Sequence, residues 1–199
     1  MLNFRSVLMA AVVALGSISA PAILSPAAAA INNQDPAQFI NGFASEGFAA
    51  LRTGSRAAAK AQFRTLLAQH VAVDAIGDRL IRRWAAKISP AQKAAYKAAF
   101  PNYIIGTYAD RLFDYSRADF KVVRSTPVGT GVDVTTQVTK PGAQPITAIW
   151  SVGKLGTAYK VTNLKVAGVN LALTQAADFD AIIQRKGFDA LVEMMKSRS

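Results

Sequence analysis

Apolar residues recur at helical spacing through residues 36–115. Asp35-Pro36 combines an N-cap residue with a proline at the first helical position, which predicts a helix start. The spacing of large apolar side chains then predicts helices over residues 36–51, 55–71 and 73–87. Ser89-Pro90-Ala91-Gln92 has the pattern of a capping box and predicts a fourth start. Pro101 is expected to kink or divide the helical region that follows.

The hydrophobic period changes to two residues from Phe120 onward. Apolar and polar side chains alternate over residues 132–139, 146–152 and 159–161, and Leu164 and Val166 then take up the opposite phase. Glycine and proline pairs separate these runs. The pattern predicts an antiparallel meander of about four strands with one covered face.

Two short helices are expected at the end of the chain. Thr174 is the expected cap of the first, which ends at Lys186-Gly187, and the second runs from Phe188 to Met195. Helices followed by a sheet and further helices indicate an α+β layer fold without an internal repeat.

Residues 1–30 have the three parts of a secretory signal: a basic start, a short apolar segment and small residues before a cleavage site. The apolar run from Val7 to Leu15 is shorter than the roughly 20 residues that a membrane-spanning helix requires. We therefore expect cleavage after Ala30 or Ala29, export to the periplasm and a single domain over residues 31–199.

Charge and composition restrict the kinds of partner that the protein is expected to bind. The chain carries a net charge of +11 and no cysteine, so disulfides and thiol chemistry are excluded. A strongly basic exported domain suits anionic lipid headgroups or acidic protein surfaces, and export disfavours nucleic acid as a partner.

No residue set typical of catalysis is present. The single histidine, His70, is expected near a helix end, where a cation would interact favourably with the helix dipole. Asp110 and Asp114 are expected on a solvated ion-pair face, and Asp178 and Asp180 at a helix start. The sequence also has no glycine-rich phosphate loop and no metal-ligand spacing, so we expect neither an enzyme nor a cofactor.

The order and spacing of short motifs resemble the MlaC family, also called the toluene-tolerance or ABC-transporter auxiliary family. The resemblance starts with Phe63-Arg64-x-Leu66-Leu67 and His70, and it covers nearly the whole chain after residue 30. The further matching motifs are Asp74-x-Ile76, Trp84, Ser89-x-x-Gln92, Tyr96, Phe100, Tyr103, Tyr108, Arg111-Leu112, Tyr159-Lys160-Val161-x-Asn163-Leu164, Gly168-Val169-x-Leu171, Asp178-Phe179, Ile182-Ile183 and Gly187-Phe188-Asp189-x-Leu191.

This resemblance implies a periplasmic phospholipid shuttle between the outer and inner membranes. Its expected fold has helices packed around a curved antiparallel sheet, with an apolar lipid cavity between the layers. Its expected partners are a phospholipid, an inner-membrane ABC-type lipid transporter complex and an outer-membrane lipoprotein complex, with transient contacts at membranes. A related branch associated with hopanoid biosynthesis has the same architecture, and it provides the alternative function. An enzyme that uses a buried aspartate or tyrosine on this fold is a third hypothesis.

Two groups of side chains are expected to carry the function. The expected lipid contacts are Trp84, Phe100, Tyr103, Tyr108, Leu112, Trp150, Val152, Tyr159 and Val161. The expected contacts to a headgroup or a partner protein are Arg79, Arg83, Arg111 and Lys160. Aromatic residues at helical spacing also fill ordinary cores, so the pattern alone leaves both roles open for each apolar residue.

Overall fold

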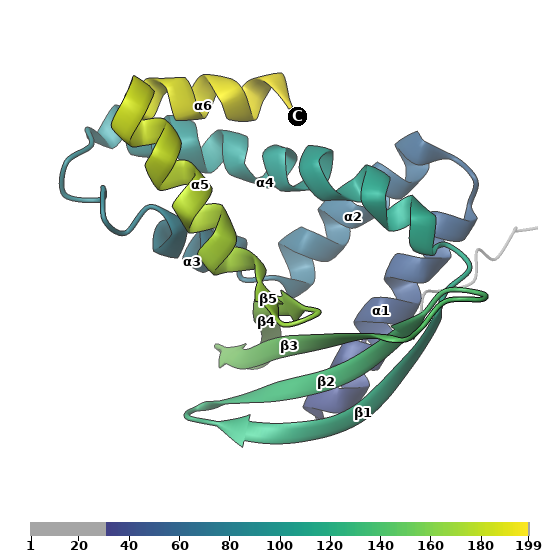
Figure 1. Cartoon of the computed structure of the whole chain (residues 1–199). Helices are drawn as coiled ribbons and strands as arrows, with labels where there is room; N and C mark the ends of the chain where they lie inside the picture. The colour runs from purple at the N-terminus through teal and green to yellow at the C-terminus, as the bar shows by residue number, and fades with distance from the viewer. Residues whose placement is uncertain (1–30, 199) are drawn as a thin grey trace, which may run out of the picture. The chain divides into compact units, whose positions relative to one another are not determined.

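The computed structural model describes residues 31–198, except the side chains at positions 110 and 111 (Figure 1). The expected signal sequence over residues 1–30 lies outside these described residues. The helices are α1 (Pro36–Arg52), α2 (Arg56–His70), α3 (Val73–Leu80), α4 (Pro90–Leu112), α5 (Leu171–Lys186) and α6 (Phe188–Ser197). The strands are β1 (Asp119–Val128), β2 (Gly131–Thr139), β3 (Ile146–Leu155), β4 (Ala158–Val166) and β5 (Val169–Asn170), and the short 3-10 helix η1 (Phe113–Tyr115) follows α4.

Side-chain caps begin the first, second and fourth helices where the sequence predicts them. Asp35 accepts a hydrogen bond from the Gln38 backbone N–H at 2.8 Å, and Ser55 caps α2 in the same way. Ser89 and Gln92 form the complete capping box, with bonds of 3.0 and 3.1 Å. These bonds satisfy backbone donors that a helix start would otherwise leave unpaired.

The third helix is shorter than the predicted 73–87, because α3 ends at Leu80. Beyond it the backbone bonds span three residues instead of four, as in Trp84 N–H to the Ile81 carbonyl at 2.8 Å. The Trp84 indole N–H donates to the Asp180 carboxylate at 2.5 Å, which ties this turn segment to α5. A tertiary hydrogen bond therefore accompanies the departure from local helical periodicity.

Pro101 does not divide the fourth helix, since α4 continues from Pro90 to Leu112. A proline inside a helix removes one backbone donor and crowds the preceding turn, which is why a kink or a division was expected. Here the helix packs against both α2 and α6. Tertiary packing of this kind stabilises a helix, and α4 continues across the proline.

The sheet is antiparallel and curved, with the order β1-β2-β3-β4-β5 (Figure 1). It contains five strands and not about four, because Ala167 and Gly168, both at positive φ, turn the chain so that Val169 pairs with Val166. The register of β4 against β3 shifts at Thr162, which is the β-bulge behind the phase change in the sequence. The α+β class itself is confirmed.

The start of α5 differs from the prediction. Asn170 is the N-cap, and its side chain accepts from the Ala172 and Leu173 backbone N–H groups at 3.1 and 3.2 Å. Thr174 therefore lies inside the helix, and Asp178 and Asp180 lie in its middle instead of at its start. The predicted end at Gly187 is confirmed, and its φ of 84° is one that glycine adopts readily.

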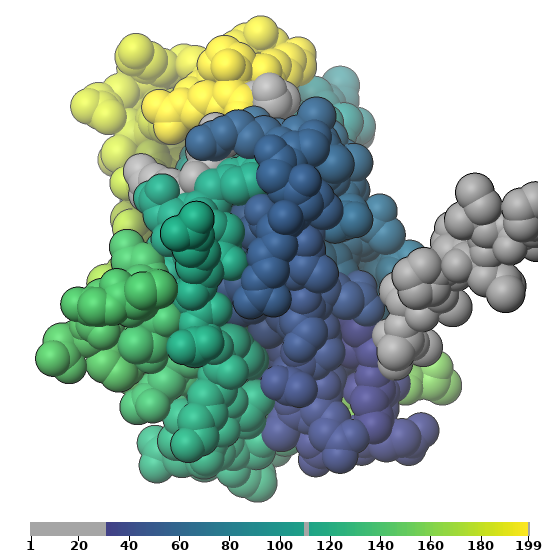
Figure 2. All heavy atoms as spheres, turned by 90° about the vertical axis from the view of Figure 1, so that its right-hand side faces the viewer, coloured from purple at the N-terminus to yellow at the C-terminus, as the bar shows by residue number. Residues whose placement is uncertain are grey.

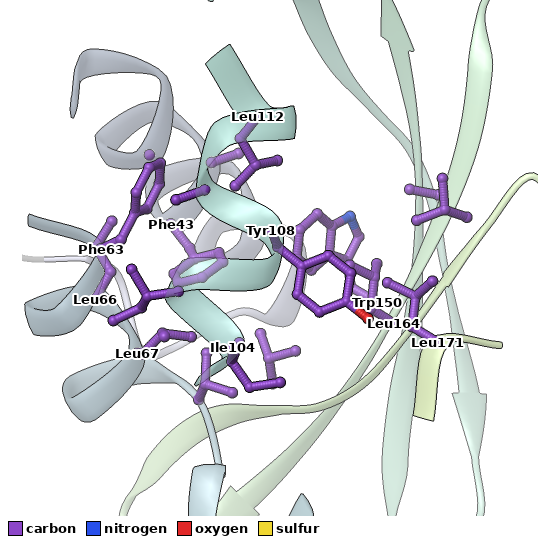
Figure 3. A pocket seen from close by; sticks show the side chains of 18 of the residues that line it. Phe43, Phe63, Leu66, Leu67, Ile104, Tyr108, Leu112, Trp150, Leu164 and Leu171 are labelled. Carbon is purple, nitrogen blue, oxygen red and sulfur yellow. The ribbon is translucent and has the colours of Figure 1, made fainter. Parts of the chain in front are cut away.

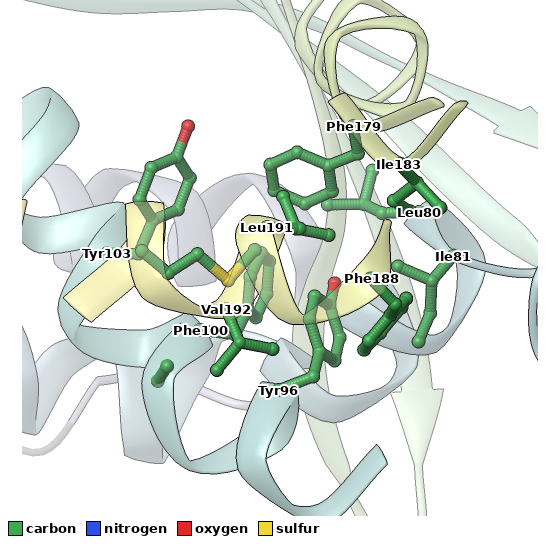
Figure 4. Packing of buried hydrophobic residues seen from close by; sticks show 12 residues of the cluster. Leu80, Ile81, Tyr96, Phe100, Tyr103, Phe179, Ile183, Phe188, Leu191 and Val192 are labelled. Atoms are coloured by element: carbon green, nitrogen blue, oxygen red, sulfur yellow. The ribbon is translucent and has the colours of Figure 1, made fainter. Parts of the chain in front are cut away.

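Buried apolar side chains form two clusters. A helical cluster joins the segment around α3 to α4, α5 and α6, with Tyr96, Phe179 and Leu191 fully buried (Figure 4). A sheet cluster joins α1 and α2 to β2, β3 and β4, around Phe39 and Val134. The structure thus has one core among the helices and another between helices and sheet.

Candidate functional site

A cavity of about 600 Å³ lies between the two clusters and is open to solvent (Figure 3). Helices α1 and α2 supply one wall, and Figure 2 shows these two helices lying together on one face. Helix α4 and the start of α5 supply a second wall, and the sheet supplies a third. The cavity therefore occupies the space that separates the helical core from the sheet core.

The lining is almost wholly apolar. It includes Phe43, Phe63, Leu66, Leu67, Ile104, Leu164 and Leu171 (Figure 3). Polar side-chain atoms come only from Tyr108, Tyr115, Trp150, Asn163 and Gln175 among the described lining residues. None of those residues is charged. Such a lining favours a ligand with a large apolar surface and few polar groups.

One stripe of α4 carries much of the lining. Phe100, Ile104, Tyr108 and Leu112 follow one another at intervals of four residues, and all four line the cavity. Leu112 is also 40% exposed, so the lining reaches the surface of the protein there. Residues four apart lie on one helix face, which explains why the stripe points in one direction.

The structure brings five of the nine expected lipid contacts to this cavity. They are Phe100, Tyr108, Leu112, Trp150 and Val161. The Trp150 indole N–H donates to the Thr136 hydroxyl at 3.0 Å, and its ring meets Phe43 edge to face. This pair of contacts fixes the ring while its remaining surface faces the cavity.

The other four expected lipid contacts do not line the large cavity. Trp84 lies beside the helical cluster and is bonded to Asp180. Tyr103 is buried against Phe179, and Val152 is buried in the sheet cluster. Tyr159 packs against the ring of Phe39 in that same cluster. Tyr103 and Val152 are thus buried, whereas Trp84 and Tyr159 are half-buried, with the amino groups of Lys87 and Lys154 over their rings.

The expected headgroup or partner contacts lie outside the cavity lining. Arg79 donates to the Thr162 carbonyl, and Lys160 donates to the Gln69 carbonyl. Arg83 pairs with Asp180 at 3.2 Å. The side chain of Arg111 lies outside the described residues. The three described cations therefore lie on the outer surface of the helices and of β4.

The structure also identifies cavity residues that the sequence interpretation missed. Gln175 is the clearest case, because it occupies the series Leu171, Gln175, Phe179, Ile183, in which each other member is apolar. A polar residue at a position where the spacing predicts a buried apolar side chain can be recognised in the sequence as a candidate site residue. Phe43, Phe63 and Ile104 carried no such signal, since their pattern is that of ordinary core residues.

Gln175 is held by two tyrosines from α4. The hydroxyls of Tyr103 and Tyr108 both donate to its Oε1 atom at 3.3 Å. A second, smaller cavity also borders Gln175, and Tyr103, Asp178, Arg185 and Arg198 are among its lining residues. Gln175 lines both cavities, so it stands where the apolar space adjoins a polar one.

His70 lies at the end of α2, as predicted, but its environment disfavours the cation. Its ring meets those of Phe39 and Phe43 edge to face, with centroids 5.9 and 6.2 Å away. Burial, and then the nearby charge of Lys160, lower the pKa of His70 below its ordinary value of 6.5. The neutral ring is therefore the form that the folded protein favours, which corrects the expected cation at the helix dipole.

This environment predicts a pH-dependent stability. The folded state binds the His70 proton more weakly than the unfolded state, so stability falls as the pH drops below about 6.5 towards the lowered folded pKa. We expect the melting temperature of the wild type to decline more between pH 7 and pH 5 than that of His70→Gln. Thermal unfolding across this range measures the difference, and parallel curves for the two proteins would contradict the prediction.

Among the side chains of residues 31–198 that are described, no three metal-binding groups come together. No helix within this range has the length and hydropathy needed to cross a membrane.

Fold and cavity together define an α+β protein built around a large apolar cavity between an open antiparallel sheet and its helices. Residues 46–197, more than half of the chain, match the family described as MlaC protein, and the chain belongs to that family. Its structure is similar to that of the phospholipid-binding protein from Ralstonia solanacearum in complex with a phospholipid. The TM-score is 0.67 at 20% identity, over 80% of this chain and 93% of the other, which shows a shared fold.

Proposed function

We propose that this protein binds a phospholipid and carries it through the periplasm. The observation that supports the proposal most directly is the cavity, which is large, open and without a charged side chain among its described lining residues. The similar protein from Ralstonia solanacearum, whose structure contains a phospholipid, supports the same ligand class.

The physical need for a carrier follows from the hydrophobic effect. At about 0.8 kcal/mol per CH₂ group, exposing one acyl chain of roughly sixteen carbons to water costs on the order of 10 kcal/mol. A cavity with non-directional apolar contacts recovers that free energy without fixing the chain at one position. Such binding suits a protein that must also release its cargo.

The proposed acyl-chain contacts are Phe100, Ile104, Tyr108, Leu112, Trp150 and Val161. The basic residues Arg79, Arg83 and Lys160 are proposed as contacts to acidic partners, because they lie at the surface and line neither cavity. On this proposal residues 1–30 direct export and residues 31–199 form the lipid-binding domain.

Family membership also supports a place in a transport route. We propose that the carrier exchanges lipid with an inner-membrane ABC-type transporter complex and with an outer-membrane lipoprotein complex. The net charge of +11 favours encounter with anionic membranes and acidic protein surfaces.

The experiment that tests the proposal is lipid analysis of the purified protein. Native mass spectrometry is expected to show one co-purified phospholipid, and lipid-free protein is expected to extract phospholipid from vesicles. A co-purified hopanoid would support the alternative carrier, and a chemically altered lipid would support an enzyme. Protein that stays lipid-free in both assays would contradict the proposal.

A further inference from the structure

Gln175 is the one buried glutamine side chain of the described residues, and it lies against a cavity whose lining is almost wholly apolar. Only 7% of the residue is exposed. Its carbonyl oxygen accepts hydrogen bonds from the hydroxyls of Tyr103 and Tyr108, which come from successive turns of α4. Two donors converging on one oxygen fix which end of the amide points away from the tyrosines.

The amide nitrogen is the end that remains. It carries two N–H donors, and the structure gives it no acceptor among the described residues. The nitrogen is not one of the fully enclosed side-chain atoms that lack a partner, so it is accessible at the cavity lining, where it is placed to donate to an acceptor on a ligand. Leu171 and Ala172, one turn earlier in α5, line the same cavity and have no side-chain acceptor, and Asn163, whose Oδ1 atom is buried without a hydrogen-bond partner, lines it from β4.

The position of Gln175 indicates which part of a lipid would supply that acceptor. The large cavity that Gln175 borders has an almost wholly apolar lining, and the small cavity that it also borders is lined by Asp178, Arg185 and Arg198 among others. A glycerophospholipid has the same order of chemistry along its length: apolar chains, then ester carbonyls, then a charged headgroup. The ester group is the part that matches the boundary between the two cavities.

We propose that the Gln175 Nε2–H group donates a hydrogen bond to an ester carbonyl of the bound lipid, and that it makes the protein selective for ester-linked over ether-linked chains. The inference rests on the proposed function and adds a specificity-determining residue to it. Tyr103 lines the smaller cavity and not the larger one, and its hydroxyl donates to the Gln175 Oε1 atom, so its role in this proposal is that of a positioning residue.

A pair of matched lipids tests this selectivity. The probes are diacyl and dialkyl phosphatidylglycerol with equal chain lengths, which differ only in the two ester carbonyls. Each competes with a fluorescent phospholipid for the lipid-free full-length protein. A neutral hydrogen bond of typical net strength corresponds to roughly 3- to 10-fold tighter binding of the diester by the wild type.

Variants locate the source of the preference. Gln175→Leu keeps the size of the side chain and is expected to bind both lipids equally. Tyr103→Phe removes one hydroxyl that holds the amide and is expected to lose part of the preference. Leu173→Met changes an exposed residue of the same helix that lines neither cavity, so it is expected to keep the wild-type ratio. Circular dichroism confirms folding, and Gln175→Met replaces Gln175→Leu if the latter unfolds.

The outcomes separate the two proposals. Equal binding of both lipids by the wild type would overturn the role of Gln175 and leave lipid carriage standing. A preference that persists in the folded Gln175 variant would also overturn it. Failure of the wild type to bind either lipid would contradict lipid carriage itself.

Discussion

Ile104→Glu is expected to lower phospholipid affinity at least 100-fold while the protein remains folded. Ile104 lies in the α4 stripe, and its side chain is directed into the cavity (Figure 3). With lipid bound, the new carboxylate would be enclosed by acyl chains. Burying the charged form, or protonating it to bury the neutral form, would cost several kcal/mol of binding free energy. Each 1.4 kcal/mol corresponds to a tenfold loss of affinity. Without lipid the open cavity lets the carboxylate keep its water, so folding suffers less.

The matched control is Leu155→Glu. Leu155 is 45% exposed at the end of β3 and does not line the cavity, so the same charge there is expected to leave lipid binding unchanged. Lipid bound per protein, measured by extraction and mass spectrometry, is compared with the melting temperature of each variant. Wild-type lipid occupancy in folded Ile104→Glu would mean that acyl chains do not occupy this cavity.

Local chemistry accounts for the elements that the sequence predicted well. Asp35, Ser55 and the pair Ser89-Gln92 begin helices because their side chains bond backbone groups within three residues. Such bonds depend on neighbours in the sequence and need no knowledge of the fold. Two of the elements that were predicted less well, α3 and β5, involve distant contacts. The end of α3 is accompanied by the bond between Trp84 and Asp180, and β5 exists through its pairing with β4.

The candidate site shows a different limit. Tyr103 and Tyr108 are five residues apart on one helix, and both are aromatic positions in an amphipathic pattern. Tyr103 is buried because Phe179 of α5 packs against it, whereas Tyr108 faces the cavity. The distinction is set by what lies opposite each face, which periodicity along one chain does not record. Gln175 differs because its polarity conflicts with its spacing, and that conflict is visible in the sequence.

Leu191→Ala is expected to lower the free energy of unfolding by about 2–5 kcal/mol, because the truncation leaves a cavity in the helical core. Leu191 of α6 is 0% exposed and belongs to the cluster with Tyr96 and Phe179 (Figure 4). Urea unfolding at equilibrium measures the loss. Leu173→Ala is the matched control, since Leu173 is 70% exposed and the same truncation there removes little buried surface.

Leu191→Ala in the core is expected to lower stability, whereas Ile104→Glu in the cavity is expected to lower phospholipid affinity. Leu191 does not line the cavity, so the folded fraction of Leu191→Ala is expected to bind phospholipid with wild-type affinity. Ile104→Glu is expected to lose affinity and keep most of its stability. If Leu191→Ala lost affinity in proportion to stability, the helical core and the cavity would form a single cooperative unit. Independent effects would instead mean that the helical core stays folded while lipid enters and leaves the cavity.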